Sequence, residues 1–126
     1  MAHKSRLACL VIDCKTTDLD EAIRFWGGAL GYPVYRSEDD PRYAIIETPT
    51  DQPKMLLQAV DHDSRIHLDI ETDDKGAEVA RLEALGARIV ARMSRWIVME
   101  APTGHRFCVV NPQRPDFAAR AHEWSE

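Results

Sequence analysis

The sequence predicts an α+β fold made of two tandem βαβββ modules, whose curved mixed sheets surround a cleft with the helices outside. Two observations predict this fold. The order of strand-like and helix-like segments in residues 6–60 is repeated in residues 65–110. The landmarks recur as well, since an Asp opens each helical segment, Leu-Gly closes it, and an aromatic-x-x-x-Glu segment follows. One module alone leaves a sheet face bare, which a second module can cover.

Length, composition and charge indicate a single domain, residues 1–126. A chain of 126 residues with 44% apolar residues can build a real core. The net charge is −5 and the 16 Lys and Arg are scattered, unlike the basic patch of a nucleic-acid-binding protein. No run approaches the roughly 20 apolar residues of a membrane span, and the start lacks a signal-peptide pattern. We expect a cytoplasmic protein with a small-molecule partner and with no nucleic-acid or membrane partner.

Module one, about residues 6–62, begins with a strand and an amphipathic helix. Asp18 is the expected N-cap of the helix in "TTDLDEAIRFWGGALGY", and Glu21 completes a capping box. Gly31 supplies the stop signal. Turn residues separate the expected strands, which are 6–15 before the helix and 34–37, 42–47 and 54–60 after it.

Module two, about residues 63–111, repeats the pattern after a join near residues 61–64. In its first strand, 65–72, the alternation predicts that Ile66, Leu68 and Ile70 face the core, with His67 and Asp69 on the other side. The expected helix lies in "DDKGAEVARLEALG", and the expected later strands are 87–92, 95–100 and 106–110.

The tail, residues 112–126, is expected to form a short helix from about Asp116. Phe117 and Trp124 would be its apolar anchors. Because an isolated helix this short is marginal in water, we expect it to dock on its own domain or on a partner subunit.

The segments "LDEAIRFWGGALGY", "HLDIETDD", "ARLEALGARIV" and "APTGHRFCVV" occur in this order within the repeat. This arrangement resembles the vicinal oxygen chelate superfamily of glyoxalase, bleomycin-resistance and extradiol-dioxygenase relatives. It is most similar to the small glyoxalase-like domains of bacterial genomes. The resemblance implies a homodimer, and a metal in the cleft held by the first and last strand of each module.

The resemblance also implies where the metal ligands would lie. The first-strand ligand falls seven residues before the Asp that opens the helix, which gives His67 in module two and Val11 in module one. Cys108 stands where the family has a Glu ligand, and Gln58 is the corresponding residue of module one. The implied set is therefore His67 with Gln58 and Cys108, for a divalent ion such as Zn, Mn, Fe or Ni. Asp13 or Asp69 could substitute for the missing carboxylate.

The expected cleft residues include a possible general base. Glu47 and Glu100, at two strand ends, are candidates, because a carboxylate at a cleft mouth can have a raised pKa. The alternatives are solvated glutamates, a neutral buried Cys108 thiol and ordinary sheet packing of the aromatic side chains. The ligand-pocket candidates are Val11, Asp13, Tyr43, Gln58, His67, Asp69, Trp96 and Cys108.

Three functions compete. The first is a glyoxalase-like cleft protein that binds a small organic molecule without a complete metal site. The second is a metal-dependent lyase or dioxygenase, in which the ion would chelate two substrate oxygens. The third is a non-catalytic structural or regulatory domain. The residues at Val11 and Cys108 favour the first function, His67 keeps the second open, and strict glyoxalase I activity is not expected.

Overall fold

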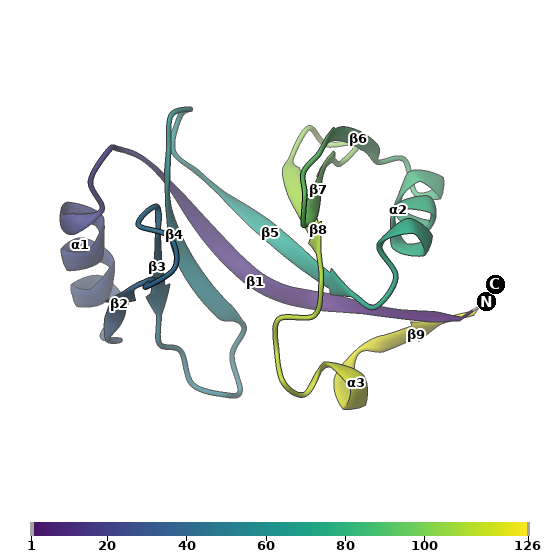
Figure 1. Ribbon diagram of the computed structural model, residues 1–126, viewed down its shortest axis with the longest axis horizontal. Coiled ribbons are helices and arrows are strands. Elements are labelled where there is room, and N and C mark those ends of the chain that lie inside the picture. Colours follow the sequence, from purple (N-terminus) through teal and green to yellow (C-terminus); the bar gives the residue numbers. More distant parts are fainter. Residues whose placement is uncertain (1, 126) are drawn as a thin grey trace. The chain divides into compact units, whose positions relative to one another are not determined.

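The computed structural model, which describes residues 2–125, confirms the α+β class and the repeated element order (Figure 1). The first half contains β1 (His3–Lys15), α1 (Asp20–Leu30), β2 (Val34–Arg36), β3 (Tyr43–Ile46) and β4 (Lys54–Val60). The second half contains β5 (Arg65–Thr72), α2 (Lys75–Ala84), β6 (Arg88–Arg92), β7 (Trp96–Glu100), β8 (Arg106–Val110), α3 (Phe117–Arg120) and β9 (His122–Trp124). None of the helices in these residues is long and apolar enough to cross a membrane.

The chain forms two compact units. Residues 9–67 form the first unit, and residues 2–8 together with 68–125 form the second. The first half of the long strand β1 therefore belongs to the second unit. In the first unit the strands run in the order β2-β3-β4-β1, and in the second they run β5-β8-β7-β6. The pairs β1–β4 and β5–β8 are parallel, whereas the other neighbours are antiparallel.

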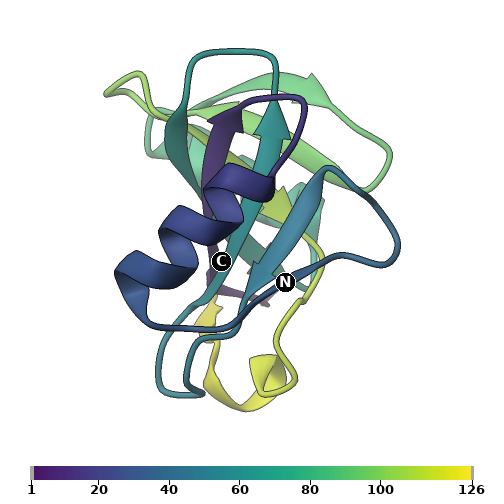
Figure 2. The ribbon, with the colours of Figure 1, turned by 90° about the vertical axis from the view of Figure 1, so that its left-hand side faces the viewer.

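Helix α1 covers one face of the first unit's sheet (Figure 2). The buried side chains of this core are Ile12, Leu19, Ala44, Ile46 and Leu57, and Trp26 packs against them as a core residue. Because strand side chains alternate between faces, the neighbours of these residues point to the other side of the sheet. We call that side the helix-free face of the first unit; it carries Val11, Asp13, Tyr43, Ile45, Leu56 and Gln58.

The start of α1 differs from the predicted capping box. The N-cap position is Leu19, which makes no side-chain capping bond. Asp18 lies one residue earlier, where its Oδ1 accepts a hydrogen bond from the backbone N–H of Asp20 at 2.9 Å. The carboxylate still satisfies one of the open N–H groups of the helix, so the predicted stabilisation is present in a turn rather than in a capping box. The end is as predicted, with Gly31 in the left-handed region.

Helix α2 covers one face of the second unit's sheet. Val79 and Leu82 of the helix pack on Ile97, Met99, Phe107 and Val109 of β7 and β8. Asp74 is the N-cap, and its side chain accepts a hydrogen bond from the N–H of Ala77, as the sequence predicts. The opposite side of these strands, which carries Asp69, Trp96, Val98 and Cys108, is the helix-free face of the second unit.

The tail does not form the single anchored helix that we predicted. Helix α3 has only four residues, and Trp124 lies in strand β9, which pairs with the start of β1 (Figure 1). Phe117 is a buried anchor of the helix. Because so short a helix has few internal hydrogen bonds, pairing with an edge strand satisfies more of the backbone. The Trp124 indole N–H also donates to Ser5 Oγ at 2.8 Å.

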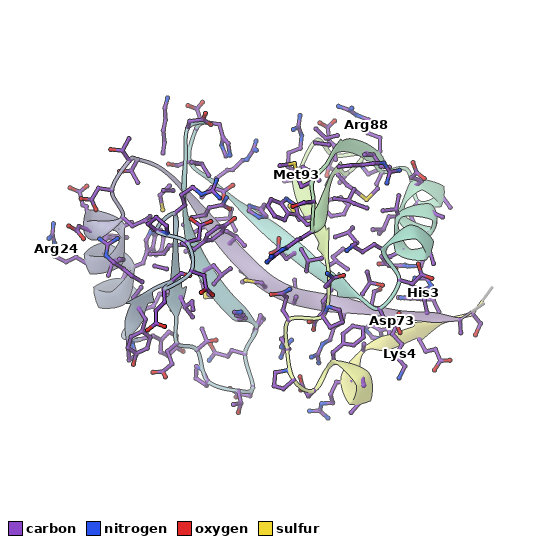
Figure 3. All side chains as sticks on the ribbon, in the orientation of Figure 1. His3, Lys4, Arg24, Asp73, Arg88 and Met93 are labelled. Carbon is purple, nitrogen blue, oxygen red and sulfur yellow. The ribbon has the colours of Figure 1, made fainter. Side chains whose placement is uncertain are left out.

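A buried ion-pair network holds the first residues of β1 to α2 in the second unit. His3, labelled in Figure 3, has its Nε2 2.7 Å from Glu78 Oε1. Arg81 donates two hydrogen bonds to the same carboxylate, at 2.9 and 2.8 Å, and its guanidinium lies 4.0 Å from the centre of the Trp124 ring. Glu78 itself is fully buried. One carboxylate thus joins β1, α2 and, through Arg81, β9.

Strand β5 departs from the predicted alternation. Ile66 and Leu68 are 60% and 44% exposed, whereas the His67 side chain between them is only 12% exposed. The prediction that these two apolar residues face the core is therefore wrong. The core beneath α2 reaches Ile70 but not the first half of β5. A hydrogen bond to Asp13 holds His67 in its largely buried position.

Two glycines provide a matched stability test. Gly86 has φ +108°, and a Cβ built there would lie 2.9 Å from Pro102 Cγ. Gly28, in the middle of α1, has no heavy atom within 4 Å of such a Cβ. We expect Gly86→Ala to lower the free energy of unfolding by about 2 kcal/mol. Gly28→Ala should raise it by roughly 0.5–1 kcal/mol, because alanine is the better helix former. Urea denaturation of both variants checks the contrast, and similar effects at the two positions would contradict it.

Candidate functional site

Asp13, Gln58 and Tyr43 form a polar row on the helix-free face of the first unit. Asp13 of β1 is the register partner of Gln58 on β4, and Gln58 is the register partner of Tyr43 on β3. In the next row, Val11, Leu56 and Ile45 are partners in the same way, and Val11 is only 1% exposed. The helix-free face of the first unit thus carries a polar row beside an apolar row.

Asp13 lies at the β1 end of this polar row, next to Gln58. Its side chain is 3% exposed, and Oδ2 lies 3.0 Å from Nδ1 of His67 at the start of β5. Its Oδ1 is buried and makes no hydrogen bond to any group within residues 2–125. A carboxylate that is taken out of water with so few hydrogen bonds needs positive charge nearby.

The permanent positive charge comes from Arg65, and an imidazole, that of His62, lies beside it; we predicted neither residue. His62, in the loop between β4 and β5, has its Nε2 3.8 Å from Asp13 Oδ2, and Arg65, the first residue of β5, has its Nε at the same distance. The signal was present in "DHDSRIH", where both basic residues precede His67 in a module-joining loop. We call Asp13, His62, Arg65 and His67 the Asp13 cluster.

An open hollow of about 790 Å³ adjoins the Asp13 cluster in the first unit. It shares His62 with the cluster and Gln58 with the polar row, and Lys15, Arg42, Thr16 and Thr17 also line it. Its volume lies within the roughly 300–1,000 Å³ typical of small-molecule sites.

The second unit carries an equivalent row on its own helix-free face. Asp69 is the register partner of Cys108, and Cys108 is the partner of Val98. Gln58 in module one and Cys108 in module two are therefore each the register partner of an aspartate. The two aromatic residues do not correspond, because Tyr43 faces Gln58 whereas Trp96 faces Val110.

One group of side chains has the composition of a metal site. His67 and Asp69 lie two residues apart on β5, and Cys108 lies beside Asp69 on β8. One ligand atom from each lies within 4.8 Å of the others. Nitrogen, oxygen and sulfur donors together suit Zn²⁺ better than Mg²⁺ or Mn²⁺. The bond from His67 to Asp13 is the outer carboxylate contact typical of a metal-binding histidine. Asp69 is the carboxylate of this group.

The two candidate general bases lie in different surroundings. Hydrogen bonds from Arg106 and Arg88, at 3.0 and 3.1 Å, hold the pKa of Glu100 below its ordinary value. This shift is opposite to the raised pKa that we expected of a base. The exposed Glu47 accepts a hydrogen bond from the Tyr35 hydroxyl at 3.4 Å. Within residues 2–125, no hydrogen bond or ion pair joins either glutamate to the Asp13 cluster.

Comparison with known proteins shows which family the chain belongs to. The profile of a glyoxalase-like domain matches residues 9–110. No protein of curated function matches it in sequence. A methylmalonyl-CoA epimerase from Streptomyces coelicolor, solved with 2-nitronate-propionyl-CoA, has a similar fold, with a TM-score of 0.61, 19% identity, and coverage of 86% of this chain and 98% of that one.

Two further structures are similar in fold. The methylmalonyl-CoA epimerase from Mycobacterium tuberculosis has a TM-score of 0.57 and 23% identity over 90% of this chain and 91% of that one. A hypothetical protein from Bacillus halodurans has a TM-score of 0.62 and 13% identity over 87% of this chain and 96% of that one. These likenesses confirm the vicinal oxygen chelate fold that the sequence predicts.

Proposed function

Because the chain belongs to the glyoxalase-like domain family, we propose that it binds a small organic molecule on the helix-free face of its first unit, without a complete metal site. The observation that carries this proposal is the hydrogen bond between the buried Asp13 and His67. The bond fixes the imidazole ring and directs any contact with a ligand through Nε2. Gln58 and Tyr43, in the same polar row, add an amide and a phenol.

The chemistry of these groups favours a ligand rich in oxygen. An imidazole held by a carboxylate can accept a proton from a hydroxyl group or an acidic C–H, and can later return it. The amide and the phenol can each donate a hydrogen bond to a carbonyl oxygen. The related epimerases were solved with CoA esters bound. Acyl-CoA esters and small oxygen-bearing acids are therefore the first compounds to test.

The second candidate function is a metal-dependent lyase or dioxygenase. His67, Asp69 and Cys108 would hold the ion, and the mixed donor set fits Zn²⁺ best. When bound, the ion would polarise a substrate oxygen as a Lewis acid. Asp13 would orient His67, and an imidazole of the Asp13 cluster would hold or move a proton. The group contains a single imidazole and no Glu, so strict glyoxalase I activity is not part of the proposal.

Other features remain predictions. We propose that the protein is a homodimer, and the exposed Ile66 and Leu68 on β5 are apolar surface that a second copy could cover. Cytoplasmic location and the single-domain division into residues 6–62, 63–111 and 112–126 stay predictions from the sequence. A non-catalytic regulatory domain would show no small-molecule binding at all.

Thermal unfolding with a ligand panel tests the proposal. The panel contains malonate, benzoate, catechol and methylmalonyl-CoA, each with and without EDTA. We expect at least one compound to raise the melting temperature equally with and without the chelator, because ligand binding to the folded state adds to stability. Stabilisation that EDTA removes, together with near-stoichiometric zinc by elemental analysis, would support the metal-dependent alternative. No stabilisation by any compound would contradict both binding functions.

A further inference from the structure

Resting on the proposed function, the geometry points to Arg65 as the binding point for an oxyanion of the ligand. The ligand class is therefore an organic acid, with a carboxylate or a phosphate group docked on Arg65 while the rest of the molecule faces His67 and Gln58. Arg65 makes no hydrogen bond to Asp13 or His67 within residues 2–125, so it can serve recognition rather than proton transfer.

The surroundings of Asp13 leave its cationic neighbour able to bind an added anion. Arg65 supplies the permanent positive charge beside the carboxylate, and the imidazoles of His62 and His67 lie around the same group. His67 already makes the hydrogen bond to Oδ2 at 3.0 Å. The Arg65 guanidinium lies 3.8 Å from that oxygen, close enough for charge attraction but beyond hydrogen-bond distance. An oxyanion can complete the hydrogen bonding of Arg65 without displacing His67.

The guanidinium of Arg65 has donors left for a ligand. Its only hydrogen bond within residues 2–125 joins Nη2 to His62 Nε2 at 3.5 Å, and its side chain is 46% exposed. Arg42 and Arg81, by contrast, each donate two bonds to one carboxylate, Asp40 and Glu78 respectively. A guanidinium presents five N–H donors in a fork that matches a carboxylate or a phosphate. Asp13 keeps this fork at the site by charge attraction without using it.

The adjoining hollow provides space for the rest of the ligand. Its two cations already have carboxylate partners, because Arg42 donates to Asp40 and Lys15 lies 3.6 Å from Asp63. His62 belongs to both the Asp13 cluster and the hollow, and its ring is held by a 2.8 Å contact between Nδ1 and the Asp63 carbonyl oxygen. A ligand docked on Arg65, next to His62, can therefore extend into this space, and Arg65 is the cation with free donors.

Calorimetric titration with matched probes tests this inference. The probes are malonate, its uncharged counterpart malonamide, and inorganic phosphate, at constant ionic strength. We expect malonate or phosphate to bind the wild type, malonamide to bind far more weakly, and Arg65→Gln to reduce the affinity for the anion about tenfold. Arg65→Lys should keep part of the affinity. The anion whose affinity falls more in Arg65→Gln shows whether the site prefers a carboxylate or a phosphate group.

The control is Arg24→Gln, which removes the same charge from an exposed residue of α1 that points away from the sheet (Figure 3). Equal effects of Arg65→Gln and Arg24→Gln, equal binding of malonate and malonamide, or no binding of either anion would overturn the inference. A neutral panel compound that still requires His67 would leave the proposed function standing in each of these cases. Loss of all small-molecule binding would remove both.

Discussion

Glu78→Ala is expected to lower the free energy of unfolding by about 3–5 kcal/mol, the cost typical of breaking a buried ion pair. Glu78 is fully buried and accepts two hydrogen bonds from Arg81. The alanine variant leaves His3, which is 4% exposed, without its 2.7 Å partner. It also removes the anchor that holds Arg81 against Trp124. Chemical denaturation at pH 7 measures the loss.

The same side chain predicts a pH dependence. Burial alone would raise the pKa of Glu78, but hydrogen bonds from Arg81, His3 and Ser5 outweigh it and hold the pKa below its ordinary value of 4.5. A carboxyl with a depressed pKa adds stability that is complete above its unfolded pKa and is lost as the pH falls through the folded one. Wild type should therefore lose more stability than Glu78→Ala as the pH falls below 4.5.

Glu83→Ala is the matched control, because Glu83 lies on the same helix and is exposed. Its effect should stay within about 0.5 kcal/mol, as for ordinary surface substitutions. If Glu78→Ala costs no more than this control, the network does not stabilise the second unit.

Asp13→Asn and His67→Ala are each expected to weaken binding of the most stabilising panel compound by tenfold or more, on the order of 1.4 kcal/mol. Asparagine keeps the shape of Asp13 but removes the charge that orients and supports the imidazole. Because the two residues act through one hydrogen bond, the double variant should bind no more weakly than His67→Ala alone.

Titration calorimetry of the wild type, both single variants and the double variant gives a double-mutant cycle, which measures how strongly the two residues depend on each other. His105→Ala, in the exposed turn before β8, is the control for loss of an imidazole and should bind like wild type. Additive losses from Asp13 and His67 would mean that the two side chains act separately, and the proposed pair would then be wrong.

Local sequence patterns predicted most of the fold. The cap at Asp74 and the stop at Gly31 follow from hydrogen bonding within one turn, and both are confirmed. Errors occurred where contacts between distant segments decide the outcome. Alternation along β5 could not show that α2 reaches Ile70 but leaves Ile66 exposed. The apolar character of Trp124 could not show that it pairs with the start of β1 in a strand.

The candidate site was predictable to a similar degree. The resemblance to the vicinal oxygen chelate superfamily implied Gln58 and His67 as site residues and offered Asp13 as a substitute carboxylate, and the structure places Asp13 beside both of the others. His62 and Arg65 were missed because their importance depends on the fold of a loop, which brings them to a carboxylate about 50 residues earlier in the chain. Arg88 and Arg106, which lower the pKa of Glu100, were missed for a similar reason. They lie opposite Glu100 because of the register of strands β6, β7 and β8, which the sequence alone does not show.

The measurement that tests the central claim most directly is an NMR spectrum of the histidine ring nitrogens in EDTA-treated, metal-free protein, recorded during titration with the most stabilising panel compound. The account predicts that the His67 signals show a proton on Nδ1 in the free protein and shift in proportion to ligand occupancy, with assignment by His67→Ala. Signals of His67 that stay unchanged at saturation, or that shift only after zinc is added, would contradict a metal-free site built on Asp13 and His67.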